Sequence, residues 1–400
     1  MGFAAVNAFV FDLVGVSSFL VWAHLSRRGY WLRGVTYRTS VIPRSQELFL
    51  RAWLYFNLIW VLDFILRRIG NWGHLLRLVI LWVPSITWAV CGPLRVNSRD
   101  GSGFDPKSQS WLIWKWLAKG LFKNCSVVMS EEWAALNAEE VRRWTDGHES
   151  PFILPMHPHG YFPIGGMING LTWFGGGMPP LTVSGKELAY KTESPGKLLH
   201  QNVFPHMKLT AGVASFCFWF PGFYEIYSKL GCIEATKPFL ATALRKGKTV
   251  ALYPGGAAES GMSRPGRYVA YCRKHKGFLR LALEEHIDLL PVYTFGEESV
   301  LPQPSSVFGP IAFLQRFLTE ATGLRIPPAF GGLPSAPPLT TVVGLPISLK
   351  DLWSAEIGEP VAEASVDIAL KRYIDSQQKL FDQNKALVPG NHKDARLEVL

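Results

Sequence analysis

Two short apolar runs, each followed by a turn that carries chemically active side chains, constrain the fold of this 400-residue chain most strongly. Residues 151–156 (Pro-Phe-Ile-Leu-Pro-Met) precede His-Pro-His-Gly at 157–160, and residues 248–253 (Lys-Thr-Val-Ala-Leu-Tyr) precede Pro-Gly-Gly-Ala-Ala-Glu at 254–259. Short apolar runs bounded by turns are typical of buried parallel strands in an α/β sheet. Because active sites lie beyond the carboxyl ends of such strands, the two turns are expected to meet if the strands are neighbours.

The segments around these two runs alternate between strand and helix patterns. Helices are predicted from Asn137 to about Trp144, from Thr236 to Lys246, and along an apolar stripe near the C-terminus. Further strands are predicted at 180–184, 288–295 and 340–345, and a Pro- and Gly-rich loop or lid between Leu301 and Pro338. This alternation predicts an α/β fold with a mainly parallel or mixed sheet flanked by helices.

The N-terminal 96 residues have a different character, with three hydrophobic stretches. Residues 3–25 are long enough to span a bilayer, at about 1.5 Å per residue against about 30 Å of hydrocarbon. Residues 48–90 resemble a shallow hairpin in one leaflet, and the alternative is a pair of amphipathic helices that cover the soluble domain. Arginine and lysine on both flanks of the hairpin predict that both flanks are cytoplasmic. The expected organisation is a membrane-embedded region at 1–96 and a cytosolic catalytic domain at 97–400.

The net charge indicates which binding partners suit this chain, and the cysteine pattern indicates which covalent and metal-binding features it lacks. The formal charge is +10, which favours nucleic acid, a phospholipid surface or a phosphorylated cofactor. No nucleic-acid-binding motif occurs, so a membrane surface fits better. One segment either extends this membrane-binding surface or forms a solvated face over buried aromatic residues. It contains Lys115, Lys119 and Lys123 interleaved with Trp111, Trp114 and Trp116. Five scattered cysteines indicate neither a disulfide framework nor a thiolate metal site.

The pair His157 and His159 has three interpretations: a catalytic base, metal ligands, or ordinary polar residues at a strand end. No familiar metal-binding spacing accompanies the pair, so no metal is expected. An imidazole with a pKa near 6.5 takes the proton of an alcohol as that alcohol attacks a carbonyl. Glu259 is the candidate to orient the imidazole, and amides of Gly255, Gly256 or Ala257 are candidates to meet an oxyanion. A solvent-facing Glu259 is the alternative.

No enzyme nucleophile is evident, because no Gly-x-Ser-x-Gly elbow occurs. Direct transfer from an activated donor to a hydroxyl is therefore favoured over a covalent acyl-enzyme, with Cys217 and Cys272 as the remaining thiol candidates. Residues 264–280 carry six cations and no acid, including Arg273 and Lys276. The phosphates of coenzyme A suit this segment, and a membrane contact or a solvated face is the alternative.

These motifs together resemble the type-2 diacylglycerol acyltransferase family, which includes monoacylglycerol and wax-ester acyltransferases. Beyond the two turns, the resemblance rests on further ordered motifs between about 111 and 385. They are Phe-Pro-Gly-Phe-Tyr-Glu (220–225), Lys-Gly-Phe-Leu-Arg-Leu-Ala-Leu (276–283), Leu-Pro-Val-Tyr-Thr-Phe-Gly-Glu (290–297), Val-Val-Gly-Leu-Pro-Ile (342–347), and Tyr-Ile then Leu-Phe-Asp-Gln-Asn-Lys near 373–385.

The resemblance implies an endoplasmic-reticulum membrane enzyme that esterifies a glycerolipid hydroxyl with acyl-CoA as co-substrate and with no bound cofactor. It implies catalytic roles for His157, His159 and Glu259, with a slight preference for His159 as the base. It implies functional roles for Gly160, Gly255, Gly256, Lys276, Gly277, Phe278 and Glu297. The sequence departs from the family pattern in two places, which bear on the acceptor specificity and on the membrane topology. The Tyr-Phe-Pro triplet of the family is absent from 120–126, and residues 3–25 add a third apolar stretch.

Diacylglycerol is the expected acceptor, and monoacylglycerol or a long-chain alcohol is the alternative within the same class. Two other classes remain open at this point: a non-catalytic protein that binds or shapes lipid membranes, and a metal-dependent lipid hydrolase. The oligomeric state, including a homo-oligomer, is left open by the sequence.

Overall fold

The computed structural model describes residues 99–144, 150–172, 181–183, 186–188, 204, 206–218, 223–300, 337–388 and 394–400. The predicted membrane-embedded region at 1–96 and residues 301–336 of the predicted loop lie outside these ranges, so both stay predictions. Among the described residues, none of the helices combines the length and the apolarity that a bilayer crossing requires.

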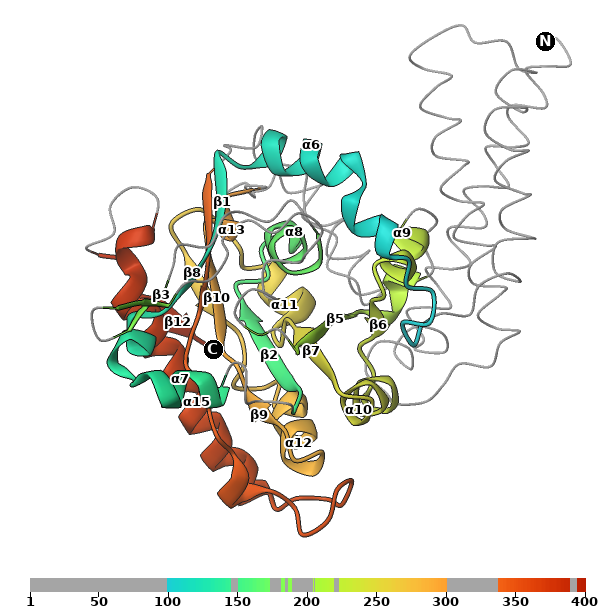
Figure 1. Cartoon of the computed structure of the whole chain (residues 1–400), viewed down its shortest axis with the longest axis vertical. Helices are drawn as coiled ribbons and strands as arrows, with labels where there is room; N and C mark the ends of the chain where they lie inside the picture. Colours follow the sequence, from blue (N-terminus) through green and yellow to red (C-terminus); the bar gives the residue numbers. More distant parts are fainter. Residues whose placement is uncertain are drawn as a thin grey trace, which may run out of the picture.

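A mixed sheet forms the centre of the fold (Figure 1). Its strands are β1 (Asn124–Met129), β2 (Phe152–His157), β5 (Lys208–Val213), β6 (Ile233–Glu234), β7 (Lys248–Leu252), β9 (Asp288–Leu289), β10 (Val292–Phe295) and β11 (Pro338–Val343). They run in the order β1-β11-β10-β2-β7-β5-β6, with β9 paired to β2. The β10–β11 pairing is antiparallel, whereas β2 pairs in parallel with β7, β9 and β10. The predicted α/β fold with a mixed sheet is confirmed.

Helices cover both faces of this sheet (Figure 1). They are α6 (Leu112–Leu121), α7 (Ala138–Trp144), α8 (Ile164–Leu171), α9 (Phe223–Lys229), α10 (Lys237–Arg245), α11 (Gly256–Ser260), α12 (Gly277–Glu284), α13 (Glu297–Val300) and α15 (Glu363–Asn384). Short 3-10 helices lie at Pro106–Ser110, Glu131–Ala135, Ser215–Phe218, Lys350–Leu352 and Lys385–Leu387.

The central strand β2 is buried on both faces, which explains its continuous apolar sequence. Ile153 packs with core residues of α10, α12 and α15, including Leu279. Its neighbour Leu154 points to the other face and packs with Trp133. Because His157 is two positions on from Pro155 and four from Ile153, it lies on the face covered by α12 and α15.

Several predicted boundaries agree with the structure, and others differ for clear reasons. The capping box of α7 is present, since Asn137 N–H donates to Glu140 Oε2 at 2.9 Å and Glu140 N–H donates to Asn137 Oδ1 at 2.9 Å. The strand predicted at 288–295 is split into β9 and β10 around Pro291, which has no amide hydrogen to donate. The strand predicted at 180–184 is β3 (Leu181–Val183), which pairs antiparallel with β4 (Lys186–Leu188) in a separate ribbon.

A further pairing brings the C-terminus onto the catalytic half. Strand β12 (Leu397–Val399) pairs in parallel with β8 (Tyr268–Ala270). The amides of Cys272 and Arg273 both donate to the carbonyl of Leu400, at 2.9 and 2.8 Å. The segment that follows the glycine-rich turn is therefore fixed by the last residues of the described chain.

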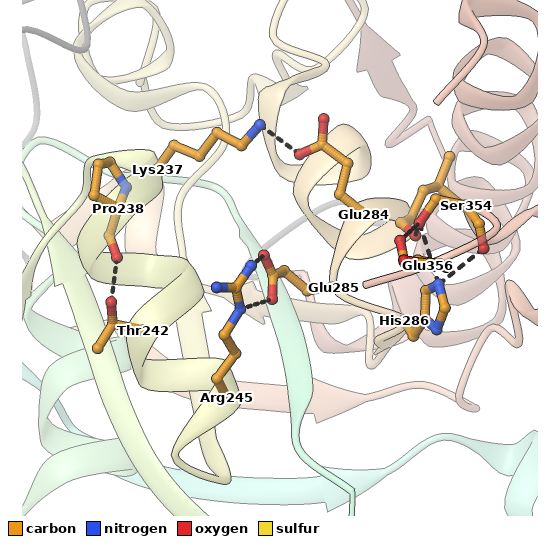
Figure 2. Close-up of polar contacts among 10 residues, drawn as sticks. Lys237, Pro238, Thr242, Arg245, Glu284, Glu285, His286, Ser354 and Glu356 are labelled. Atoms are coloured by element: carbon orange, nitrogen blue, oxygen red, sulfur yellow. Dashed lines mark hydrogen bonds and ion pairs between the residues drawn. The ribbon is translucent and has the colours of Figure 1, made fainter. Parts of the chain in front are cut away.

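Ion pairs tie α10 to the C-terminal end of α12 and its C-cap residue, near the start of β7 (Figure 2). Arg245 donates two hydrogen bonds to Glu285, Nε to Oε2 and Nη2 to Oε1, both at 2.7 Å. Lys237 pairs with Glu284 at 2.7 Å. The Glu285 side chain is only 2% exposed, so its charge depends on Arg245 for compensation.

Replacing Arg245 with leucine is expected to lower the free energy of unfolding by about 1–3 kcal/mol, because it leaves the buried Glu285 carboxylate without its partner. Arg372→Leu is the matched control, since Arg372 makes the same two-pronged contact with the exposed Asp351. Thermal unfolding of the purified chain measures both variants. A smaller loss in Arg245→Leu than in Arg372→Leu contradicts this account.

Candidate active site

The parallel neighbours β2 and β7 bring the two predicted turns together. His157 is the last residue of β2, and Glu259 lies in α11, which begins four residues after β7 ends. Nδ1 of His157 and Oε2 of Glu259 are 2.7 Å apart. The two residues are buried, with exposed fractions of 0% and 1%. The alternative of a solvent-facing Glu259 is therefore wrong.

Glu259 contacts three groups from three segments. Oε2 accepts from the amide of Tyr271 at 2.9 Å as well as contacting His157, and Oε1 accepts from the amide of His159 at 2.5 Å. Because both oxygens of Glu259 accept from backbone amides, Nδ1 of His157 is assigned as the donor in the 2.7 Å contact, and the neutral tautomer of that ring then has Nε2 as its acceptor. Sequence reasoning missed Tyr271, because a backbone amide leaves no signature in the residue type.

The Nε2 atom of His157 is buried and has no hydrogen-bond partner in the part of the chain that the structure describes. The imidazole packs against Tyr373 of α15, with ring centroids 6.2 Å apart. Tyr373 in turn packs against Phe278 at 5.1 Å. A buried polar atom without a partner is uncommon in folded proteins, and catalytic groups are one of the recognised exceptions.

His159 has a different environment from His157. Its side chain is partly buried, and its ring nitrogen Nδ1 donates to the carbonyl of Gly160 at 3.2 Å. Its ring packs edge-on against Tyr253 with centroids 5.2 Å apart. Burial lowers the pKa of His159, so this imidazole is neutral at physiological pH. Glu259 thus contacts the ring of His157 and only the backbone of His159.

Gly160 is required by both its conformation and its contacts. Its φ is +62°, in the left-handed region, and a Cβ atom there would lie 2.8 Å from Cγ of Glu297. Glu297 is buried, and its Oε1 accepts from the amide of Gly165 in α8 at 3.1 Å. Burial raises the pKa of Glu297 to about 8, so its carboxyl group is largely protonated at neutral pH.

The glycine-rich turn makes room for the Glu259 carboxylate, and one of its amides is not free to bind an oxyanion. A Cβ atom on Gly255 would lie 2.2 Å from Oε2 of Glu259, so only glycine leaves room for the folded-back carboxylate. The amide of Gly256 donates to the carbonyl of Tyr253 at 3.0 Å. Of the three amides predicted to meet an oxyanion, that of Gly256 is therefore already occupied.

The basic segment at 264–280 is partly neutralised by acids. Lys276 pairs with Glu363 at 3.3 Å and with Asp367, and Arg280 pairs with Glu363 at 2.6 Å. Arg273 is exposed and its Nε donates to the carbonyl of Val399. Gly277 begins α12, and Phe278 is a buried core residue that packs against Tyr373, the neighbour of His157. These contacts leave Arg273 as the more accessible predicted phosphate ligand.

Two other kinds of chemistry, a cysteine nucleophile and a bound metal ion, find little support among the described residues. Burial raises the pKa of the Cys217 and Cys272 thiols to about 12, so neither is a thiolate at neutral pH. In the same part of the chain, no three His, Cys, Asp or Glu side chains are grouped closely enough to hold a metal ion. The histidine–carboxylate pair is therefore the best-formed chemical group of the described site.

The buried contact between His157 and Glu259 lies at the carboxyl edge of the α/β sheet. A sequence model described as "Diacylglycerol acyltransferase" matches residues 194–399, which include Glu259 and Glu297. The chain is 31% identical over 267 residues to "Diacylglycerol O-acyltransferase 2-like protein 6" of Mus musculus, covering 62% of this chain and 70% of that protein. It is 32% identical over 257 residues to "Diacylglycerol O-acyltransferase 2" of Danio rerio, covering 61% and 63%.

A longer match extends over most of the sequence. The chain is 25% identical over 364 residues to "2-acylglycerol O-acyltransferase 1" of Bos taurus, covering 86% of this chain and 93% of that protein. The chain belongs to the diacylglycerol acyltransferase family, as its motifs predict, and it is an acyltransferase.

The raised pKa of Glu297 makes the free energy of unfolding depend on pH, and it sets the sign of that dependence. Between pH 4.5 and 8 the unfolded chain loses this proton while the folded chain keeps it, so the free energy of unfolding falls as pH rises, by at most about 1.4 kcal/mol per pH unit. Glu297→Gln is expected to remove this slope. Thermal unfolding at pH 5.5 and 8 measures it.

Glu363→Gln serves as the control for this experiment. Its partner Arg280 holds the pKa of Glu363 below the usual range, so it titrates below the measured interval and leaves the slope unchanged. If the Glu297→Gln variant and the unmodified chain lose stability in parallel from pH 5.5 to 8, Glu297 is not protonated in the folded state.

Proposed function

We propose that this chain transfers an acyl group from acyl-CoA to the free hydroxyl of diacylglycerol, which yields triacylglycerol and free coenzyme A. Acyl-CoA acts as a co-substrate, and no bound cofactor is required. The family supports the reaction class, and two of the relatives above carry diacylglycerol acyltransferase names. The observation that carries the catalytic part of the proposal is the 2.7 Å contact between His157 and Glu259.

The reaction is a direct displacement at the thioester. Nε2 of His157 takes the hydroxyl proton as the acceptor oxygen attacks the thioester carbonyl, and a tetrahedral intermediate forms. The carbon–sulfur bond then breaks, and the imidazolium returns the proton to the departing thiolate. Glu259 holds the Nδ1 proton throughout and stabilises the positive charge on the imidazole.

The carboxylate contacts favour His157 over His159 as the base, in contrast to the slight preference from the sequence. Glu259 orients the ring of His157 and leaves Nε2 as an acceptor without a partner among the described residues. His159 receives only a backbone contact from Glu259. We assign His159 to the adjacent wall of the site, where its neutral ring packs on Tyr253.

Substituting glutamine for His157 is expected to lower acyl transfer by about 10²- to 10⁴-fold, the usual cost of losing a general base. Glu259→Gln is expected to give a large loss as well, because an amide stabilises the wrong tautomer and a neutral imidazole. His159→Gln is expected to lose less. The measurement is transfer of labelled oleoyl groups by microsomes that contain equal amounts of each variant.

His206→Gln is the control, since His206 is exposed and lies outside the site. Full activity of His157→Gln overturns the proposal. A greater loss in His159→Gln than in His157→Gln reverses the assignment of the base.

A second acceptor is tested in the same assay, because the match over 364 residues is to a protein named 2-acylglycerol O-acyltransferase 1. Diacylglycerol, monoacylglycerol and a long-chain alcohol are offered separately, and lipid products are separated by thin-layer chromatography. We expect the highest kcat/KM with diacylglycerol. A preference for monoacylglycerol or the alcohol transfers the proposal to that acceptor and leaves the role of His157 intact.

The cellular setting follows from the substrates and the sequence. Diacylglycerol resides in bilayers and acyl-CoA is water-soluble, so the enzyme must work at a membrane surface. We propose the endoplasmic-reticulum membrane, with residues 97–400 on the cytosolic side and residues 1–96 as the membrane anchor. The positive-inside pattern around the hairpin at 48–90 supports this orientation.

A further inference from the structure

Helix α6 (Leu112–Leu121) has one face that is fully accounted for by the fold. Trp114 is 1% exposed, and its indole N–H donates to the carbonyl of Ser108 at 2.7 Å. Leu117, Ala118 and Leu121 are partly buried and pack against the clusters around α8 and Trp114. This face attaches α6 to the catalytic half.

The opposite face of α6 is apolar and exposed. Leu112 is 64% exposed, Ile113 45% and Trp116 73%. These are three of the eight exposed large apolar side chains in the described part of the chain, and they lie within five residues. At about 100° of rotation per residue, the three project within about 100° of one another and form one stripe. Scattered exposed apolar residues need no explanation, but a stripe on one helix indicates a binding surface.

Lysines flank this apolar stripe. Lys115 and Lys119 are exposed on the same side of the helix, and Lys123 follows the helix and is exposed too. Within the part of the chain that the structure describes, none of the three forms an ion pair, in contrast to Lys276 and Arg280. The sequence from Pro106 to Ser130 contains four lysines and no acidic residue. The surface is therefore both apolar and positively charged.

This combination fits a bilayer better than a protein. Lysine is depleted at protein–protein interfaces, whereas tryptophan with flanking lysine is typical of helices that lie in the headgroup layer. The lysine stems extend along the apolar surface while their ammonium groups reach lipid phosphates. We propose that the outer face of α6, formed by Leu112, Ile113, Lys115, Trp116 and Lys119, docks on an anionic bilayer surface.

The position of α6 gives this contact a functional consequence. Helix α6 packs against α8, which Figure 1 shows below it. Helix α8 begins at Ile164, four residues after the His-Pro-His-Gly turn, and Phe162 between them is 42% exposed. Docking of α6 therefore places the bilayer on the side of the molecule where the chain leaves His159, which shortens the path of a lipid acceptor to the site.

Site-specific photocrosslinking tests the proposal in the full chain. p-Benzoylphenylalanine is incorporated in place of Trp116, and the protein is reconstituted in vesicles of phosphatidylcholine and phosphatidylserine with a labelled phospholipid. Irradiation is expected to transfer label to the protein. The matched control places the same residue at Ile368, which is 47% exposed on α15, and is expected to take up several-fold less label.

Charge dependence provides a second readout. The double change Lys115→Glu and Lys119→Glu is expected to lower crosslinking from position 116 by about fivefold or more, and phosphatidylcholine alone is expected to give a similar drop. Crosslinks to protein instead of lipid, or equal labelling at positions 116 and 368, overturn the proposal. Because the readout is covalent labelling, it does not depend on acyl transfer.

Discussion

The hydrogen bonds of Glu259 are the interaction on which the described site depends. A buried carboxylate is costly unless donors surround it, and Glu259 receives them from the His157 ring, the His159 amide and the Tyr271 amide. Those three groups come from β2, from the turn after β2 and from the segment after β8. One side chain therefore sets the geometry of three segments and the tautomer of the imidazole.

The residues around Glu259 leave space for its carboxylate and place little additional negative charge beside it. Gly255 leaves space for the carboxylate, and Gly160, with its positive φ and no Cβ atom, lets the chain approach Glu297 closely. Glu297 is buried nearby, but burial raises its pKa to about 8, so it adds little negative charge near neutral pH. Glu259 is the carboxyl group of the described site that contacts the His157 ring.

Local signals in the sequence were sufficient for β2, β7 and the capping box of α7, because each depends on neighbouring residues. The meeting of His157 and Glu259 also followed, since parallel neighbouring strands end at the same edge. Contacts between distant segments were not predictable in this way. Lys276 is paired by Glu363 and Asp367 of α15, and Tyr373 packs on His157, across separations that no local pattern encodes. The Tyr271 amide carries no residue-specific signal at all.

The most direct test of the central claim is a structure of the full chain with a non-hydrolysable thioether analogue of acyl-CoA and diacylglycerol. The account predicts the acceptor hydroxyl oxygen within about 2.6–3.2 Å of Nε2 of His157, with Glu259 still bound to Nδ1. An acceptor oxygen placed against His159, or remote from both imidazoles, contradicts it.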